Sequence, residues 1–176
     1  MKKILAFAGS TSSTSINKKL ATFAAENLEN TAFDIIDLRD FEMPMYSEDE
    51  EKNGFSENAK KFSSLLDTYD GFILSLAEHN GSYAAAFKNI FDWSSRIEAT
   101  VFRDKPLLLM ATSPGGMGGR FVLEAGTQKF SRMGAKELIS FSFPNFHDNF
   151  KEGEIIHKDL LKSLKEHIVK FENAVN

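Results

Sequence analysis

The chain has 176 residues, of which 42% are hydrophobic, and this size fits a single domain over residues 1–176. Its formal charge of -4 provides no basic surface for nucleic acid, and the absence of cysteine excludes disulfides, thiolate nucleophiles and Cys-based zinc sites. No apolar run approaches the ~18 residues of a membrane span and the start is too short for a signal peptide, so we expect a soluble cytoplasmic protein without a membrane partner.

Short apolar runs that alternate with amphipathic stretches predict alternating strands and helices. The runs lack regular polar alternation, which is typical of strands covered on both faces of a parallel sheet. The expected strands are residues 4–8, 33–38, 71–77, 106–111 and 137–143. The stretches between them carry apolar residues at spacings of three and four, the period of an amphipathic helix. The expected helices are residues 16–28, 56–68, 87–97, 120–133 and 158–174.

Local signals refine this outline in chain order. Acidic residues within 33–38 predict an outer position for the second strand. Residues 39–55 carry a proline, a glycine and a run of charges, so we expect a long surface loop there. Ser56 is placed to cap the helix that follows it, and Gly134 is placed to end the helix before the fifth strand.

Five strands alternating with five helices predict an α/β fold. We expect a three-layer sandwich around a five-stranded parallel sheet with the strand order 2-1-3-4-5. In such sheets ligands bind outside the carboxyl ends of the strands, beside the point where the order reverses. The loops after the first, third and fourth strands meet there, and they contain the most unusual segments of the sequence.

The loop after the first strand has six successive hydroxyl residues, from Ser10 to Ser15, and leads into a helix. The first amides of a helix have no partner within it and attract anions, while hydroxyls add donors without adding charge. A phosphate monoester is therefore the expected ligand. The segment lacks the second glycine and the lysine of a P-loop and the later glycines of a dinucleotide-binding loop. A capped loop without a ligand remains the alternative.

The loops after the third and fourth strands predict contacts with a flat ring. Asn80 and Gly81 favour a tight turn with positive φ, and the amides of that turn could bond ring carbonyls or ring nitrogens. Residues 113–119 contain four glycines, which would let the edge of a ligand approach the main chain closely. An ordinary turn and an ordinary flexible connection are the alternatives for these two loops.

Together the three segments resemble the NADPH-dependent FMN reductase family, the flavodoxin-like group that includes FMN-dependent quinone, chromate and azo reductases. The resemblance spans most of the chain and rests on the phosphate-loop pattern G-S-x-R-x-x-S-x-N, the segment P-E-Y-N-G-S followed by L-K-N-A-I-D-W, and a glycine-rich loop. The matching residues are Gly9, Ser10, Ser15, Asn17, Glu78, Asn80, Gly81, Ser82, Lys88, Asn89, Asp92, Trp93, Ser95, Arg96, Gly115, Gly116, Gly118 and Gly119.

The resemblance implies FMN as cofactor and NAD(P)H as co-substrate. Hydride would pass from NAD(P)H to N5 of the flavin and then to a quinone-like or other small electron acceptor in a ping-pong sequence, without a catalytic side chain or a metal. It also implies a homodimer or homotetramer. The expected cofactor-binding residues are Ser10, Ser12, Ser15, Ile16, Asn17, Glu78, His79, Asn80, Gly81, Ser82, Ser113, Pro114, Gly115, Gly118 and Gly119. A flavodoxin-like electron carrier and a non-catalytic FMN-binding protein are the alternatives.

The sequence departs from the family pattern at three positions. Ser12 stands where the family usually has arginine, which removes a charged donor to phosphate. Ala77 replaces proline and His79 replaces tyrosine. A titratable ring beside the flavin suggests the hypothesis that flavin affinity or reduction depends on pH between about 5 and 8.

Other conspicuous side chains are interpreted as structural. The dispersed residues His147, His157 and His167 lack the spacing of metal ligands and are expected at the surface or at helix caps. Trp93 is expected in the core. Core packing is also favoured for the phenylalanines within 141–150, with a subunit contact as the alternative.

Overall fold

The computed structural model describes residues 1–176 and contains one five-stranded sheet and two small hairpins. All pairings in the large sheet are parallel, and its strand order is β2-β1-β3-β6-β7. The strands are β1 (Lys3–Gly9), β2 (Ala32–Ile35), β3 (Gly71–Leu76), β6 (Lys105–Thr112) and β7 (Ala135–Phe143). In chain order these are the five predicted strands, so the predicted order 2-1-3-4-5 is confirmed.

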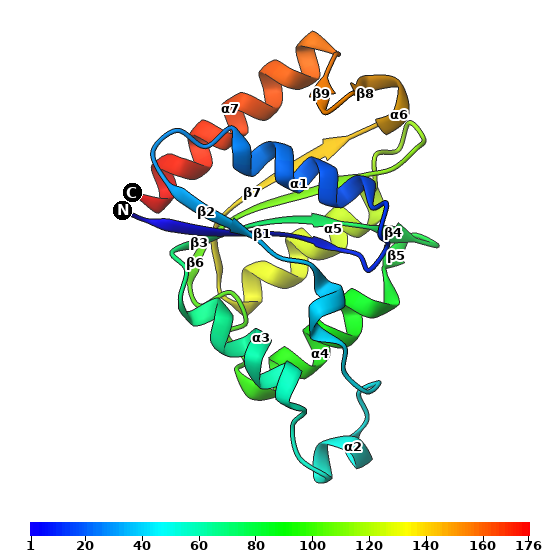
Figure 1. The fold of residues 1–176 in the computed structure, drawn as a ribbon, viewed down its shortest axis with the longest axis vertical. Helices are drawn as coiled ribbons and strands as arrows, with labels where there is room; N and C mark the ends of the chain where they lie inside the picture. The colour runs from blue at the N-terminus through cyan, green and yellow to red at the C-terminus, as the bar shows by residue number, and fades with distance from the viewer.

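Helices cover both faces of the sheet, as Figure 1 shows. On one face lie α1 (Ile16–Glu26) and α7 (Lys158–Val175), and on the other lie α3 (Glu57–Asp67), α4 (Ala85–Ile97) and α5 (Arg120–Phe130). The core is accordingly divided into two clusters of buried side chains, one on each side of the sheet. Every residue of β3 is buried, which explains why its sequence is apolar apart from Ser75. The three-layer α/β sandwich is therefore confirmed.

The second strand is shorter than predicted. It ends at Ile35, because Asp37 caps the 3₁₀ helix η1 (Leu38–Phe41) by accepting a hydrogen bond from the amide of Arg39 at 3.0 Å. Its outer position is confirmed, since β2 lies at one edge of the sheet.

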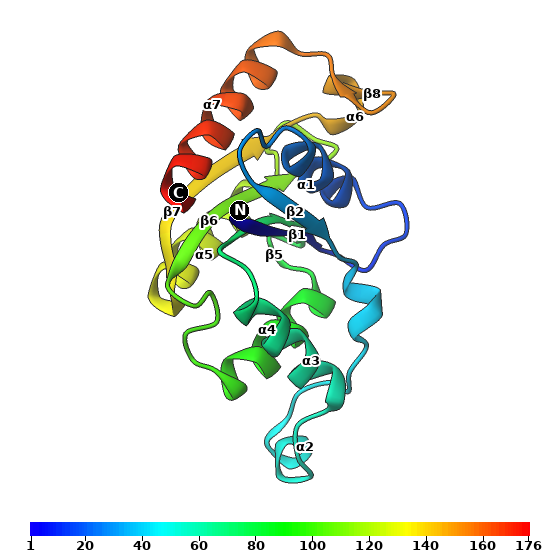
Figure 2. The ribbon, with the colours of Figure 1, turned by 60° about the vertical axis from the view of Figure 1, so that its left-hand side comes forward.

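The segment 39–55 starts in η1 against the body of the protein, and its later part projects from that body (Figures 1 and 2). It is not entirely irregular as expected, because it contains the short helix α2 (Glu48–Lys52), capped by Ser47. No residue of α2 is buried, so the sequence offers no apolar periodicity there. A bidentate ion pair between Glu51 and Arg96 of α4, at 2.9 and 3.0 Å, holds the segment against the body.

The signals at helix ends are confirmed. Ser56 caps α3 by accepting a hydrogen bond from the amide of Ala59 at 3.1 Å. Gly134 adopts a left-handed conformation with φ 84° after the 3₁₀ helix η2 (Ser131–Met133), which ends the helical stretch before β7.

The region between β7 and α7, for which no element was predicted, contains small elements. These are α6 (Phe146–Asn149) and a hairpin of β8 (Phe150–Lys151) with β9 (Glu154–Ile155). Phenylalanines of this region, including Phe146 and Phe150, are buried in the same cluster as α1 and α7, which confirms core packing. Four-residue and two-residue elements are too short to show a period in the sequence.

Trp93 is fully buried in α4, as expected, and its indole N–H donates to the carbonyl of Pro44 at 2.8 Å.

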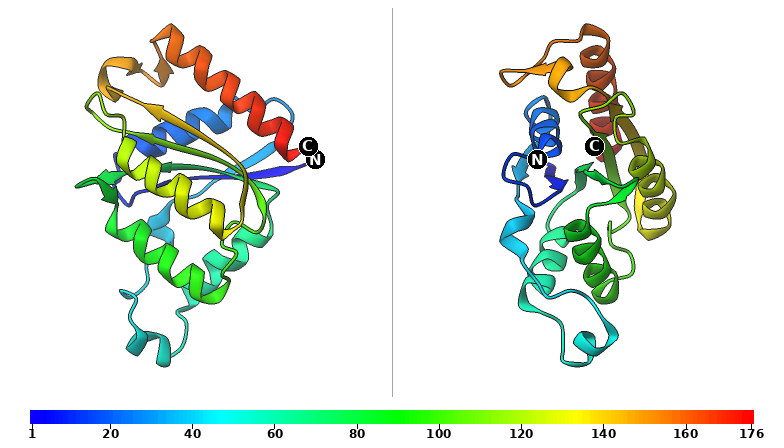
Figure 3. Two further views of the ribbon diagram at one scale, coloured as in Figure 1. Left: turned by 180° about the vertical axis from the view of Figure 1, so that it is seen from behind. Right: turned by 90° about the vertical axis from the view of Figure 1, so that its right-hand side faces the viewer.

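No helix has both the length and the apolar character needed to cross a lipid bilayer. The two termini lie side by side at the amino ends of the strands, and Figure 3 shows this from behind. The opposite end of the sheet holds the loops at the carboxyl ends of the strands, where ligands bind in this class of fold.

Candidate functional site

A hollow of about 430 Å³ opens where the loops after β1, β3 and β6 meet. Its walls are formed by residues within 10–19, 77–79 and 112–114, together with His147 of α6. We name it the hydroxyl hollow, because serine and threonine supply much of its lining. The three loops predicted to share a ligand are therefore brought together at the predicted edge of the sheet.

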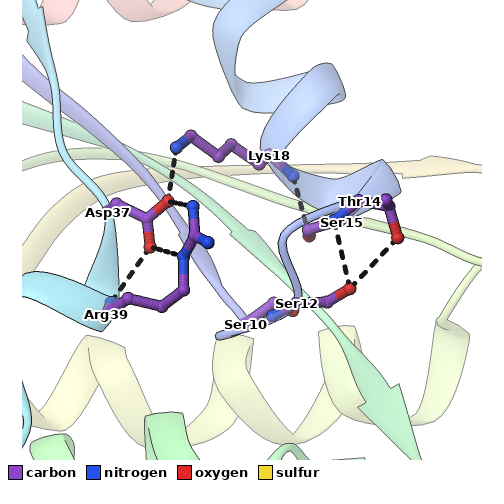
Figure 4. Close-up of polar contacts among 7 residues, drawn as sticks. All are labelled: Ser10, Ser12, Thr14, Ser15, Lys18, Asp37 and Arg39. Atoms are coloured by element: carbon purple, nitrogen blue, oxygen red, sulfur yellow. Dashed lines mark hydrogen bonds and ion pairs between the residues drawn. The ribbon is translucent and has the colours of Figure 1, made fainter.

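The loop after β1 is held by its own hydroxyl groups (Figure 4). The amide of Ser12 donates to the Ser10 hydroxyl at 3.2 Å, and the amide of Thr14 donates to the Ser12 hydroxyl at 3.3 Å. Ser15 caps α1 by accepting from the amide of Lys18 at 3.1 Å. These bonds shape the loop while leaving the exposed hydroxyls of Ser12 and Thr14 at the hollow.

The amides at the entrance to α1 remain free. The N–H groups of Ser13, Ile16 and Asn17 donate no hydrogen bond within the chain. Unpaired amides at a helix N-terminus, with hydroxyls beside them, form a cradle for an anion. The residues present therefore fit a phosphate group.

The side chain of Asn17 holds the floor of the hollow together. Its Oδ1 accepts from the hydroxyl of Ser75 at 2.7 Å and from the amide of Thr112 at 3.0 Å, and its Nδ2 donates to the Thr112 carbonyl at 3.2 Å. The side chain thereby ties α1 to β3 and β6. Asn17 borders the hollow as predicted, but its amide group is occupied by the protein itself.

The loop after β3 folds into a hairpin of β4 (Glu78–His79) with β5 (Ser82–Tyr83). Asn80 and Gly81 at its tip have φ of 51° and 72°, so the predicted turn with positive φ is confirmed. Glu78 accepts from the amide of Val122 at 2.9 Å and so fixes the hairpin to the start of α5. Of the predicted residues here, Glu78 and His79 border the hollow, whereas Asn80, Gly81 and Ser82 form the exposed tip.

The glycines of the loop after β6 divide into two groups. Gly118 and Gly119 are buried with φ of 58° and 71°, and a Cβ on Gly118 would lie 2.4 Å from the Ser142 hydroxyl oxygen. These two glycines are required by the fold itself. A Cβ on Gly115 would meet nothing within 4 Å, so Gly115 leaves open space next to Ser113 and Pro114, which border the hollow.

Several residues of the hollow were not predicted as ligand contacts. Thr14 comes from the loop after β1, Lys19 from α1, Ala77 from the loop after β3 and Thr112 from the end of β6. His147 comes from α6, 130 residues beyond Asn17. His147 is exposed, as expected. Nothing in the sequence signals its place, because only the fold of β7 and α6 brings it to this edge. Lys19 and His147 supply basic groups to a loop that has Ser12 in place of the family arginine.

A charged cluster stands beside the loop on the side of β2 (Figure 4). Asp37 accepts from Nε and Nη2 of Arg39 at 3.0 and 2.8 Å, and from Nζ of Lys18 at 2.5 Å. Hydrogen bonds from Arg39, then from Lys18, hold the pKa of the Asp37 carboxyl well below its ordinary value. Both cations are bonded to Asp37, and neither borders the hydroxyl hollow.

Comparison with known proteins agrees with this geometry. Residues 2–148 match the model of the NADPH-dependent FMN reductase family. A Mycoplasma pneumoniae protein named as the MG342 homolog is 30% identical over 144 residues, which cover 79% of this chain and 85% of that protein. The 2-hydroxy-1,4-benzoquinone reductase of a Burkholderia species is 33% identical over 118 residues, which cover 66% of this chain and 63% of that enzyme.

Solved structures share the fold over nearly the whole chain. The NAD(P)H:acceptor oxidoreductase FerB of Paracoccus denitrificans has a TM-score of 0.79 at 21% identity, covering 99% of this chain and 97% of that one. An FMN-dependent NADH-azoreductase of Bacillus anthracis, solved with FMN, has a TM-score of 0.64 at 13% identity, covering 99% of this chain and 100% of that one.

The sheet order and the loops at its carboxyl edge define a flavodoxin-like protein. With most of its length matched by one family model, the chain belongs to the NADPH-dependent FMN reductase family. It is accordingly an oxidoreductase with FMN as its cofactor and NAD(P)H as its co-substrate.

Proposed function

We propose that this protein uses NAD(P)H to reduce a quinone-like or other small electron acceptor, with both substrates using the bound FMN in turn. The observation that carries the proposal is the cradle at the entrance to α1, where free amides and the hydroxyls of Ser12 and Thr14 face one hollow. This donor set suits the phosphate of FMN. When bound, FMN supplies the redox chemistry, which requires no nucleophile or general base from the protein.

The contribution of the protein is positional. Ser10, Ser12, Ser15 and the amide of Ile16 are proposed to hold the phosphate end of the cofactor. The hairpin from Glu78 to Ser82 and the open stretch of loop at residues 113–115 are proposed to border its ring. Because Glu78 ties this hairpin to α5, both ring-binding loops are held in a fixed relation before the cofactor binds.

The proposal is tested by recording an absorption spectrum of the purified protein and then mixing the holoenzyme with NADPH and a benzoquinone. We expect flavin bands near ~370 and ~450 nm, bleaching by NADPH and recovery of colour with quinone. Flavin that keeps its colour in NADPH would support an electron carrier or a non-catalytic binder instead. Protein that refuses added FMN would contradict the flavin site altogether.

We further propose that the protein acts as a homodimer or homotetramer. The large apolar side chains of Met117 and Phe121 are 50% and 52% exposed, and they lie in the loop after β6 and at the start of α5. Contact with a second copy would remove this apolar surface from water. Light scattering of the holoenzyme tests the proposal, and a monomeric mass would contradict it.

A further inference from the structure

A second hollow, of about 480 Å³, lies on the other side of the loop after β1. Thr11 borders it, whereas its neighbours Ser10 and Ser12 border the hydroxyl hollow. Consecutive Cα atoms are only ~3.8 Å apart, so the two hollows adjoin across this loop. The other walls come from residues 38–45, around η1, and residues 85–90 of α4. We name it the methionine hollow, after Met43 and Met45.

The walls of the methionine hollow suit a flat apolar group. Phe41 and Ile90 are buried beneath it, and the flexible thioethers of Met43 and Met45 can adapt to a planar ring. The volume falls in the range that holds a drug-sized ligand rather than a single small ring. The polar side chain of Asn89 holds the wall in place, since it accepts from the amide of Tyr46 at 2.8 Å and donates to the Pro44 carbonyl at 3.0 Å.

Two charged residues border this hollow, Arg39 and Glu42. The guanidinium of Arg39 donates two of its five N–H groups to Asp37 and is thereby oriented, while 48% of the side chain remains exposed. Three N–H groups of a fixed, planar cation therefore stay available. Such a fork matches the geometry of a phosphate. The Glu42 carboxylate can accept a hydrogen bond from an amino group.

We propose that the methionine hollow binds the adenosine 2′-phosphate end of NADPH, with Arg39 as the residue that reads the 2′-phosphate. The adenine would pack between the methionines and the start of α4, and its amino group would face Glu42. The inference rests on the proposed function, because it concerns the co-substrate of the same reaction. It adds a site and a reason for this enzyme to prefer NADPH over NADH.

The test compares wild-type holoenzyme with Arg39→Gln, Arg39→Lys and the control Arg132→Gln. Arg132, in η2, is an exposed arginine that borders neither hollow. Two readouts are taken, the ratio of kcat/KM for NADPH to that for NADH, and the dissociation constants of adenosine 2′,5′-bisphosphate and 5′-AMP by calorimetry.

Wild type is expected to bind the bisphosphate about 10- to 100-fold more tightly than AMP, as expected for a charge-assisted pair of hydrogen bonds. Arg39→Gln should remove most of that difference and lower the NADPH/NADH ratio by a similar factor. Arg39→Lys should lie in between, and Arg132→Gln should behave like wild type. Equal binding of the two nucleotides by wild type, or an unchanged ratio in Arg39→Gln, would overturn the assignment.

The two proposals fail in different ways. If the holoenzyme oxidises NADPH but does not bind the bisphosphate, for example because a second copy covers the hollow, only the nucleotide site is wrong. If the protein binds the bisphosphate yet takes up no FMN, the proposed function is wrong while the nucleotide site stands.

Discussion

The two hollows share one loop but are built on different principles. The hydroxyl hollow is polar, and its floor is fixed by the buried hydrogen bonds of Asn17. The methionine hollow is largely apolar, and the single cation that borders it is oriented by Asp37, which lies outside the wall. In both, one polar side chain forms several hydrogen bonds within the protein and thereby positions the groups around it.

The comparison shows that a residue of a sequence motif is not always a residue that contacts the ligand. Asn17 belongs to the phosphate-loop pattern, yet its side chain bonds to β3 and β6. Gly118 and Gly119 belong to the glycine-rich loop, yet packing against the sheet requires them. A motif therefore contains residues that build the site as well as residues that contact the ligand, and substitutions can separate the two.

The largest effect is expected for Asn17→Ala. The change removes three buried hydrogen bonds and leaves the amide and carbonyl of Thr112 and the hydroxyl of Ser75 without that partner. Each unsatisfied buried group costs about 1–3 kcal/mol, so we expect a loss of about 4 kcal/mol in the free energy of unfolding, measured by urea denaturation without FMN.

Asn27, just beyond the far end of the same helix, provides the control. Its side chain donates one hydrogen bond, to the Phe23 carbonyl at 2.8 Å, and Asn27→Ala is expected to cost about 1 kcal/mol. Equal losses in the two variants would show that Asn17 does not hold the floor of the hydroxyl hollow.

Gly118→Ala and Gly115→Ala test whether the glycines of the loop after β6 serve two purposes. Gly118 is required by the packing of the loop, whereas Gly115 leaves open space beside the hollow. At Gly118 the new methyl group would clash with Ser142 and force a left-handed alanine, so we expect a loss of about 3 kcal/mol in unfolding free energy. At Gly115 the space is open, and stability should change by less than about 0.5 kcal/mol. Similar stability losses at both positions would contradict this division.

Much of the fold could be predicted because it rests on local patterns. The apolar runs of β1, β3 and β6 and the 3.6-residue period of the main helices are written in short stretches of sequence. The tight turn at Asn80 and Gly81 was equally local. The short helices α2 and α6 and the hairpin of β8 with β9 were missed, because a surface helix without an apolar face and two-residue strands show no period.

The site was predictable only to the level of its loops. Sequence patterns placed three loops at one edge, but which side chains turn into the hollow depends on contacts between distant segments. His147 reaches the hollow through the path of β7 and α6. The side-chain amide of Asn17 forms hydrogen bonds with the backbone of Thr112, 95 residues away. The methionine hollow carries no motif at all, since Thr11, Arg39 and Ala85 meet only after folding.

Asp37→Asn gives a smaller effect than Asn17→Ala and Gly118→Ala, and it tests how the wall of the methionine hollow is held. The Asp37 side chain is 14% exposed, and its pKa in the folded protein is lowered by Arg39 and Lys18. A lowered pKa stabilises the fold above the carboxyl pKa of the unfolded chain, about 4, and this stabilisation declines as the pH falls towards the folded value. We expect the variant to be about 1–2 kcal/mol less stable than wild type at pH 7 and at pH 5. In urea unfolding at pH 3 the gap should narrow, because the carboxyl group of the unfolded wild-type chain then binds a proton. A gap that stays constant down to pH 3 would show that the charge of Asp37 does not hold Arg39 in place.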